Sequence, residues 1–191
     1  MDVSTFITLG VIGVTSVYLV MIYNNLVRLK HNVSQAWANI DVILKQRHDE
    51  LPKLVSVCQE YMGYEKSALE DIVKARSAVA SAQQSQNMQQ LGAAETQMRL
   101  GLGNLFALAE EYPDLKANDS FKHLQSRISG LEDDIADRRE LYNSSVNLNN
   151  VRIEQFPDVL VARMFNFTSR DLLEFDEAEL KDVNIKQLFN S

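Results

Sequence analysis

The first 27 residues constrain this chain more than any other part of it. Between Asp2 and Arg28 lie 25 consecutive residues, Val3–Val27, that carry neither a charge nor a proline. A helix rises about 1.5 Å per residue, so the stretch Val3–Tyr23 covers about 30 Å, which is the thickness of the hydrocarbon core of a bilayer. Length and composition therefore predict a transmembrane helix at the N-terminus.

Two other interpretations of this segment are weaker. A cleaved signal peptide needs a basic start and a small-residue cleavage site, but Asp2 is the only charge before Arg28 and no A-x-A-like triplet occurs there. A core helix of a soluble protein would have to be apolar on every face over an unusual length. We therefore expect a span.

Small and hydroxylated residues within the segment are compatible with a bilayer. Hydroxyl groups are tolerated when they bond within their own helix, as we expect for Thr8, Thr15 and Ser16. Gly10 and Gly13 have the small side chains that let helices approach each other in membranes. We predict these two glycines as helix-packing positions.

The distribution of basic residues predicts the orientation of the span. Arg28 and Lys30 follow its C-terminal end, and nothing basic precedes it. The positive-inside rule makes these two residues the topology determinants and places the large domain in the cytoplasm, with the N-terminus outside. The single cysteine, Cys58, agrees with a reducing compartment.

The rest of the chain is poor in residues that build turns. It has seven glycines and three prolines in 191 residues, where average usage would give about 23 in total. Sandwiches and barrels of short strands need many tight turns, so long helices joined by few loops fit this composition better.

Apolar residues recur at spacings of three and four and predict four helices. The first runs from Val3 to Arg47, and Pro52 predicts a turn at residues 48–51. The other apolar stripes cover residues 51–79, 91–112 and 121–142, with a solvated tip at 81–90, a helix end at Pro113 and capping candidates at 118–120.

These elements predict an all-α protein in which a single N-terminal transmembrane helix continues into an up-and-down antiparallel four-helix bundle. The expected parts are the transmembrane helix at 1–25, the cytoplasmic bundle at 26–152 and an apolar and acidic tail at 153–191. Gly101, at an apolar position of the third helix, indicates either close approach of a neighbouring helix or a weak point.

A dense apolar cluster follows the fourth helix and must be covered by something. It can fold onto its own bundle or contact a neighbouring subunit, a partner or the membrane, because an exposed patch of this size is a liability. We predict an interaction surface formed by Phe156, Leu160, Met164, Phe165 and Phe167.

No pattern in the sequence points to catalysis or to a bound cofactor or metal. The net charge of −7 disfavours a general nucleic-acid binder. The histidines His31, His48 and His123 match no metal spacing, and no phosphate-binding loop or nucleophile elbow occurs. Cys58 lies on an apolar stripe, where a structural thiol is the default. We therefore expect no catalytic, cofactor-binding or metal residue, and no small-molecule substrate.

One polar group of residues could form a buried network. Lys45, Arg47 and Asp49 lie near the predicted first turn, and Glu65 occupies a position where an apolar side chain is expected. Our hypothesis is that Arg47 or Lys45 reaches Glu65 and fixes the register of the first helix pair. The alternative, that Glu65 is merely exposed, is equally compatible with the sequence.

Five runs of residues closely resemble the signature of LemA proteins. They are Tyr23–Leu29, Ala36–Val42, Leu44–Val55, Ala109–Asn118 and Arg139–Asn143. The resemblance covers almost the whole chain and departs at Tyr64, where the family has His, and at Asn166, where it often has Gly.

The resemblance implies a bacterial protein with one N-terminal membrane helix, a soluble helical bundle and no catalytic residues to carry over. LemA genes often neighbour membrane proteases of the HtpX type, which suggests a scaffold or adaptor. We therefore expect a non-enzymatic single-pass protein of the bacterial inner membrane, either a homo-oligomer or associated with an integral membrane partner such as an HtpX-type protease. A membrane-coupled sensor is the alternative, and a hydrolase is a remote one.

Overall fold

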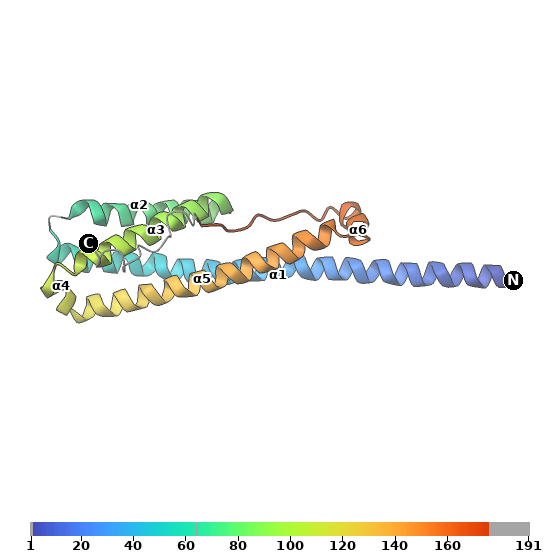
Figure 1. Ribbon diagram of the computed structural model, residues 1–191, viewed down its shortest axis with the longest axis horizontal. Coiled ribbons are helices and arrows are strands. Elements are labelled where there is room, and N and C mark those ends of the chain that lie inside the picture. The colour runs from blue at the N-terminus through green and yellow to red at the C-terminus, as the bar shows by residue number, and fades with distance from the viewer. Residues whose placement is uncertain (1, 64, 176–191) are drawn as a thin grey trace, which may run out of the picture. The chain divides into compact units, whose positions relative to one another are not determined.

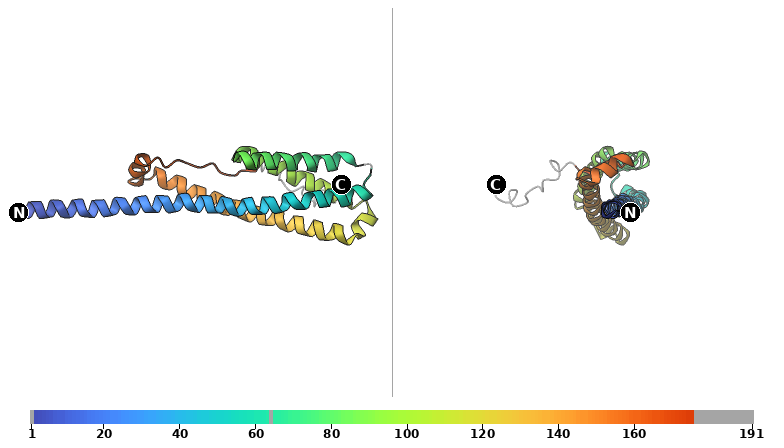
Figure 2. Two further views of the ribbon diagram at one scale, coloured as in Figure 1. Left: turned by 180° about the vertical axis from the view of Figure 1, so that it is seen from behind. Right: turned by 90° about the vertical axis from the view of Figure 1, so that its right-hand side faces the viewer.

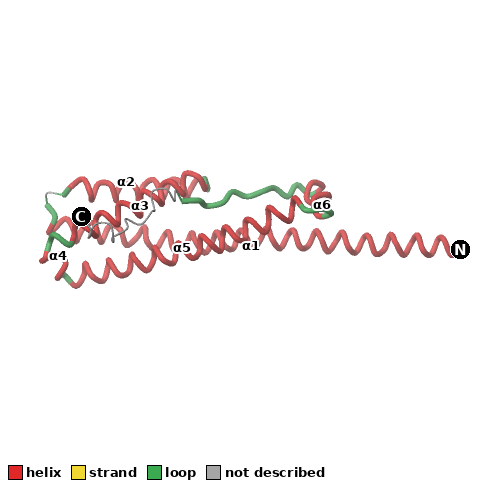
Figure 3. The backbone as a smooth tube through the Cα atoms, viewed as in Figure 1, coloured by secondary structure: helices red, strands yellow, loops and turns green. Residues whose placement is uncertain are grey.

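The computed structural model of the chain describes residues 2–63 and 65–175, and within them every regular element is a helix (Figure 3). The predicted all-α fold, with one long apolar N-terminal helix followed by further helices, is confirmed (Figure 1). The helices are α1 (Val3–Tyr61), α2 (Lys66–Ser85), α3 (Met88–Ala109), α4 (Pro113–Ala117), α5 (Asp119–Glu154) and α6 (Asp158–Met164).

Contacts divide the described residues into two compact units. Unit 1 consists of the chain up to residue 38 together with residues 140–172. Unit 2 consists of residues 39–139 together with residues 173–175 of the described tail. Each unit therefore contains one part of α1 and one part of α5. The domain boundaries expected from the sequence remain a prediction.

The predicted turn at residues 48–51 is wrong, because α1 continues to Tyr61 with Pro52 inside it. A proline within a helix cannot donate to the carbonyl four residues before it, here that of His48. In unit 2 the guanidinium Nε of Arg76, on α2, donates to this carbonyl at 3.0 Å. The freed acceptor is thereby satisfied, and the first helix ends at Tyr61 instead.

Helices α2 and α3 lie side by side in unit 2 (Figure 2). Gly101 of α3 marks their close approach, since a Cβ at this position would lie 3.1 Å from Cδ1 of Ile72. The chain reverses between the two helices at Gln86, which is left-handed with φ 51°, and the Asn87 side chain caps the N-terminus of α3. The tip predicted at residues 81–90 is too long, because α2 extends to Ser85 and α3 begins at Met88, which leaves Gln86 and Asn87 as the connection.

The start of α5 follows the predicted capping chemistry. The Asn118 carboxamide oxygen accepts from the main-chain N–H of Phe121 at 3.0 Å, and its Nδ2 donates to the hydroxyl of Tyr61 at 3.0 Å. Pro113 begins the short helix α4, whereas α3 already ends at Ala109. The apolar stripe predicted over residues 121–142 is buried on α5, where its positions are Phe121, Leu124, Ile128, Leu131, Ile135 and Tyr142.

Part of the predicted tail packs on its own chain. Leu173 and Phe175 are buried in unit 2, and the guanidinium of Arg139 lies 4.1 Å from the centre of the Phe175 ring. The backbone of Glu174 lies so close to Gly92 of α3 that a Cβ at that position would overlap the Glu174 carbonyl oxygen. Gly92 is therefore required for this docking.

Candidate functional site

The N-terminal part of α1 exposes its side chains on every face. Residues 2–21 are all exposed, and Val14 retains 73% of its accessible surface. The hydroxyls of Thr8, Thr15 and Ser16 donate to main-chain carbonyls four residues earlier, at 2.8–2.9 Å. Bonding of this kind within the helix is what a hydrocarbon environment demands of a hydroxyl. By length and composition, α1 contains a candidate membrane span.

The predicted packing and topology residues lie on the surface of α1. Apart from the adjacent residues and the backbone of the same helical turns, no described atom lies within 4 Å of a Cβ placed at Gly10 or Gly13, which leaves both glycines open to another helix. Arg28 and Lys30 are exposed beyond the apolar stretch, and the Arg28 guanidinium donates to the Asn25 carboxamide oxygen at 2.9 Å. The roles of these four residues remain predictions.

Unit 1 has a small apolar core where the exposed stretch of α1 ends. This core joins α1, α5 and α6 through Ile22, Leu26, Ile153, Val161 and Ala162, with Phe167 packed against it. The ring of Tyr23 lies 4.7 Å from that of Phe165 and 6.0 Å from that of Phe167, measured between centroids. These contacts fix α6 beside the residue of α1 at which we expect the span to leave the hydrocarbon.

Side chains of α5 hold the extended segment that follows α6. The Asn150 carboxamide accepts from the N–H of Arg170 at 2.9 Å and donates to its carbonyl at 2.8 Å. The Tyr142 hydroxyl donates to the Asp171 carbonyl at 3.0 Å. Two residues of α5, eight positions apart, therefore anchor the backbone of this segment to unit 1.

The predicted interaction residues gather around α6. Phe156, Leu160, Met164 and Phe165 are exposed, Phe156 by 81%, whereas Phe167 is half-buried beside Tyr23. The α6 helix itself is tied to α5 by an ion pair between Arg152 Nε and Asp158 Oδ2 at 2.6 Å. The structure thus places four of the five residues on the surface of unit 1, where each keeps more than half of its accessible area.

A pocket of about 310 Å³ lies between α1, α5 and the segment after α6, within unit 1. Lys30 and His31 line it from α1, Asn149 from α5 and Arg170 from the extended segment. The aromatic rings of Tyr23 and two phenylalanines close the apolar side. Sequence reasoning missed this pocket, because its residues come from three separate parts of the chain.

Unit 2 contains a buried ion cluster centred on Arg47. This side chain is 1% exposed and is bonded through Nη2 to Oε1 of Glu95, which is also 1% exposed, and through Nη1 to Oε1 of Glu132 at 2.5 Å. Arg99 Nε lies 3.8 Å from the other oxygen of Glu132. Three polar atoms of the cluster, Arg47 Nε and Oε2 of both glutamates, have no hydrogen-bond partner among the described residues.

The cluster shifts the pKa values of its members. Burial alone would lower the pKa of Arg47, but attraction to Glu95 and Glu132 outweighs it and raises that pKa. Burial raises the pKa of the Glu95 carboxyl above its usual range, against the opposing effect of Arg47. Arg47 is therefore firmly charged, whereas the charge on Glu95 depends mainly on this arginine.

Arg47 is buried in a polar network, as predicted, but its partners are Glu95 and Glu132 and not Glu65. Lys45 is exposed and bonds Asp41, at 2.5 Å, while Asp49 is exposed. Glu65 precedes α2 and forms no ion pair among the described residues. The sequence did indicate that both residues are buried, since Arg47 and Glu95 each occupy a position on an apolar stripe. It did not indicate that the two side chains contact each other, because that depends on how the helices pack.

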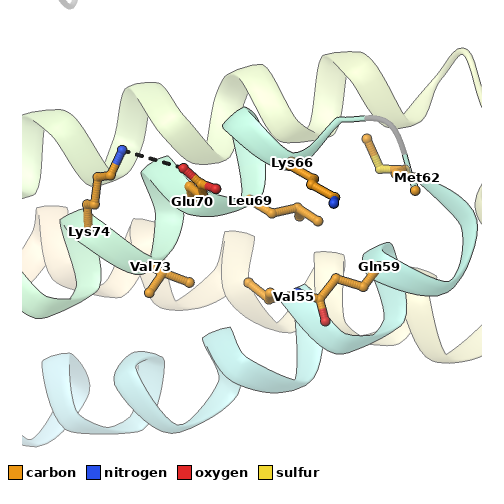
Figure 4. A pocket seen from close by; sticks show the side chains of 9 residues that line it. Val55, Gln59, Met62, Lys66, Leu69, Glu70, Val73 and Lys74 are labelled. Carbon is orange, nitrogen blue, oxygen red and sulfur yellow. Dashed lines mark ion pairs between the residues drawn. The ribbon is translucent and has the colours of Figure 1, made fainter.

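A groove of about 540 Å³ lies between the last turns of α1 and the start of α2 (Figure 4). Val55 and Leu69 form part of its apolar wall, and Lys74 Nζ lies 3.8 Å from Glu70 Oε2 at its edge. No histidine, cysteine or serine is among the described residues that line it. The charged residues of its lining are Lys66, Glu70 and Lys74, of which Glu70 and Lys74 form the ion pair.

Two further features of the described residues bear on reactivity, the single thiol and the placement of metal-binding side chains. Burial raises the pKa of the Cys58 thiol to about 11, so the nucleophilic thiolate is scarce near neutral pH. Residues 2–63 and 65–175 contain no group of three or more histidine, cysteine, aspartate or glutamate side chains placed to hold a metal.

Comparison with known proteins identifies the relatives of this chain. Magnetosome protein MamQ 2 of Paramagnetospirillum magneticum is 25% identical over 194 residues, covering 90% of this chain and 71% of the relative. Protein LemA of Metamycoplasma hominis is 26% identical over 169 residues, covering 87% and 75% of the two chains. The LemA family matches residues 36–186, which is well over half of the sequence. The chain therefore belongs to the LemA family.

Proposed function

We propose that this protein is a non-enzymatic, single-pass membrane protein of the bacterial inner membrane whose helical units act as a scaffold or adaptor. It works by assembling with copies of itself or with an integral membrane partner, of which an HtpX-type protease is one candidate. The observation that carries the proposal is the apolar stretch of α1, which is exposed on every face. Only lipid or another protein can cover such a surface.

Two further observations support this proposal over catalysis. The buried ionisable groups of unit 2 neutralise one another, and no histidine, cysteine or serine is among the described residues that line the groove beside α2. Gly10 and Gly13 leave a small-residue surface open on the span. Close helix approach at such a surface is a usual mode of association within membranes.

The orientation is part of the proposal and can be tested separately. We expect the N-terminus outside and both units inside the cytoplasm, because Arg28 and Lys30 follow the span. A membrane-impermeant thiol reagent should label Asp2→Cys, which precedes the span, in intact cells, whereas a Val73→Cys variant, exposed on α2, should react only after lysis. The opposite labelling pattern would reverse the orientation.

Assembly is tested by crosslinking in native membranes followed by mass spectrometry. We expect crosslinks from this chain to a second copy or to an integral membrane protein. Replacing both glycines of the span, as Gly10→Val with Gly13→Val, should weaken a crosslink that uses the span, whereas Val11→Ile should not. A strictly monomeric particle at micromolar concentration, with no crosslinked partner, would refute the scaffold function.

A further inference from the structure

The pocket of unit 1 lies just beyond the end of the proposed span. Lys30 follows Tyr23 by seven residues, which places it about 10 Å further along the helix axis. The headgroup layer on each side of a bilayer is about 5–8 Å thick. A lysine side chain reaches back over several ångströms to bring its charge to an interface. The pocket thus opens at the depth of the lipid phosphates.

The pocket is basic although the whole protein carries a charge of −7. Lys30, His31 and Arg170 line it, together with the amide groups of Asn149 and Asn166, and no acidic residue is among the described residues of its lining. Neither Lys30 nor Arg170 forms an ion pair with any residue that the structure describes. The lining therefore includes two cationic residues that have no ion-pair partner among the described residues, as in a site for an anion.

The backbone geometry holds Arg170 at the pocket while leaving its side chain free. The side chain of Asn150 pairs with both the N–H and the carbonyl of Arg170, at 2.9 and 2.8 Å. These two bonds fix the position of the residue but occupy no guanidinium nitrogen. Such support from neighbouring groups is typical of residues that bind a ligand in a defined position.

An exposed apolar face adjoins the basic pocket. Phe165 lines the pocket, contacts Tyr23 and is itself 53% exposed, and Leu160 and Met164, one turn apart on α6, are also exposed. Apolar side chains next to basic ones are the pattern of a segment that lies in a membrane interface. The continuity of this face with the span, through Tyr23, favours lipid over a soluble partner as its cover.

We propose that the pocket lined by Lys30, His31 and Arg170 binds the phosphate of an anionic phospholipid, while the exposed face of α6 lies in the adjacent lipid interface. This inference rests on the proposed membrane anchoring and adds a lipid class to it. Lys30 and Arg170 bind the phosphate oxygens, and the aromatic rings of the pocket contact the glycerol and upper acyl chain.

Lipid retention tests the pocket. The full chain is reconstituted in nanodiscs of phosphatidylcholine with or without phosphatidylglycerol. Native mass spectrometry then measures the lipid that stays bound to the protein when the protein is released from the nanodisc. We expect selective retention of phosphatidylglycerol. Lys30→Gln with Arg170→Gln should reduce it about 30-fold, since each basic residue near an anionic surface contributes about fivefold. The control Arg127→Gln with Arg138→Gln changes the net charge equally at exposed positions of α5 and should retain lipid like wild type.

Each outcome of this experiment bears on either the lipid site or the anchoring. Equal retention of phosphatidylglycerol by the pocket variant and wild type would overturn the proposal. Release of the bound lipid by millimolar inorganic phosphate would also overturn it, because the site would then be one for a free anion. Extraction of the wild-type chain from membranes by alkaline carbonate would refute the anchoring itself. Firm insertion with unselective retention would refute the lipid site alone.

The α6 surface has its own readout. A Leu160→Cys variant carries an environment-sensitive fluorophore, and fully buried Cys58 does not compete for the label. We expect blue-shifted emission in nanodiscs and quenching by lipids with brominated acyl chains, whereas a label at Val73→Cys on α2 should show neither. Equal quenching at both positions, or none at residue 160, would contradict an interfacial α6.

Discussion

The buried ion cluster of unit 2 makes the sharpest stability prediction. Arg47→Met removes the cation that forms an ion pair with Glu95, a carboxyl that is 1% exposed. Methionine fills much of the same volume, so the main loss is electrostatic. An uncompensated charge left behind by breaking a buried pair costs about 3–5 kcal/mol of unfolding free energy. We expect Arg47→Met to destabilise unit 2 by this amount at neutral pH.

The pH dependence of this loss follows from the burial of Glu95. Burial already raises the pKa of this carboxyl, and removing Arg47 takes away the largest opposing influence. The folded variant then holds a proton that the unfolded chain, with an ordinary carboxyl, has released. Stability therefore falls as the pH rises through the raised pKa, and the variant should be less destabilised at about pH 5 than at about pH 8.

Replacing both partners of the ion pair with neutral residues should restore most of the lost unfolding free energy. Arg47→Met with Glu95→Met removes the buried charges together, and Glu132 keeps Arg99 and is partly open to water. Apolar replacement of a buried ion pair is often neutral or stabilising. The three polar atoms that have no hydrogen-bond partner in the described cluster favour that outcome here.

The assay is urea unfolding of the full chain in a non-ionic detergent, followed by circular dichroism. Thermal unfolding gives a second measure, in which a loss of 3 kcal/mol lowers Tm by about 12 °C or more for a unit of roughly 100 residues. Arg138→Met, at an exposed position of α5, should stay within about 0.5 kcal/mol of wild type. A single variant within about 1 kcal/mol of wild type at about pH 8 would refute the reasoning, as would a double variant less stable than Arg47→Met.

Three further predictions concern packing and reactivity. Gly92→Ala should displace the tail from α3 and raise proteolysis at residues 173–175, whereas Gly103→Ala, with open space around it, should stabilise α3 by about 0.5–1 kcal/mol. Arg76→Met should cost about 1 kcal/mol by leaving the partly buried carbonyl of His48 unpaired. The cost should be smaller in a Pro52→Ala background, which restores the helical donor; equal costs in both would contradict this role. Cys58 should resist maleimide at neutral pH until the chain unfolds, and rapid labelling of the folded protein would count against its burial.

Local patterning was enough to predict the helices and most of the core. The apolar spacing located the buried face of α5 residue by residue, because a regular amphipathic helix has only one way to bury its stripe. The long uncharged stretch likewise identified the exposed part of α1. Both inferences depend on residues within a few turns of one another.

Features that depend on distant residues could not be predicted. Pro52 lies inside α1 with its freed acceptor, the carbonyl of His48, satisfied by Arg76 from another helix. Arg47 finds Glu95 and Glu132 at 48 and 85 positions further along the chain. The spacing of apolar residues does not indicate which helix packs against which. The ion-pair partners of Arg47 and the lining of the basic pocket are therefore known only from the structure.

The central claim is that the chain works in the membrane by assembling with other proteins. Its most direct test is the composition of the particle extracted from bacterial membranes with a styrene–maleic acid copolymer, without detergent. We predict that each particle holds more than one polypeptide, either further copies of the 21.7 kDa chain or an integral membrane partner. Particles that hold a single copy of this chain and no other protein would contradict this claim.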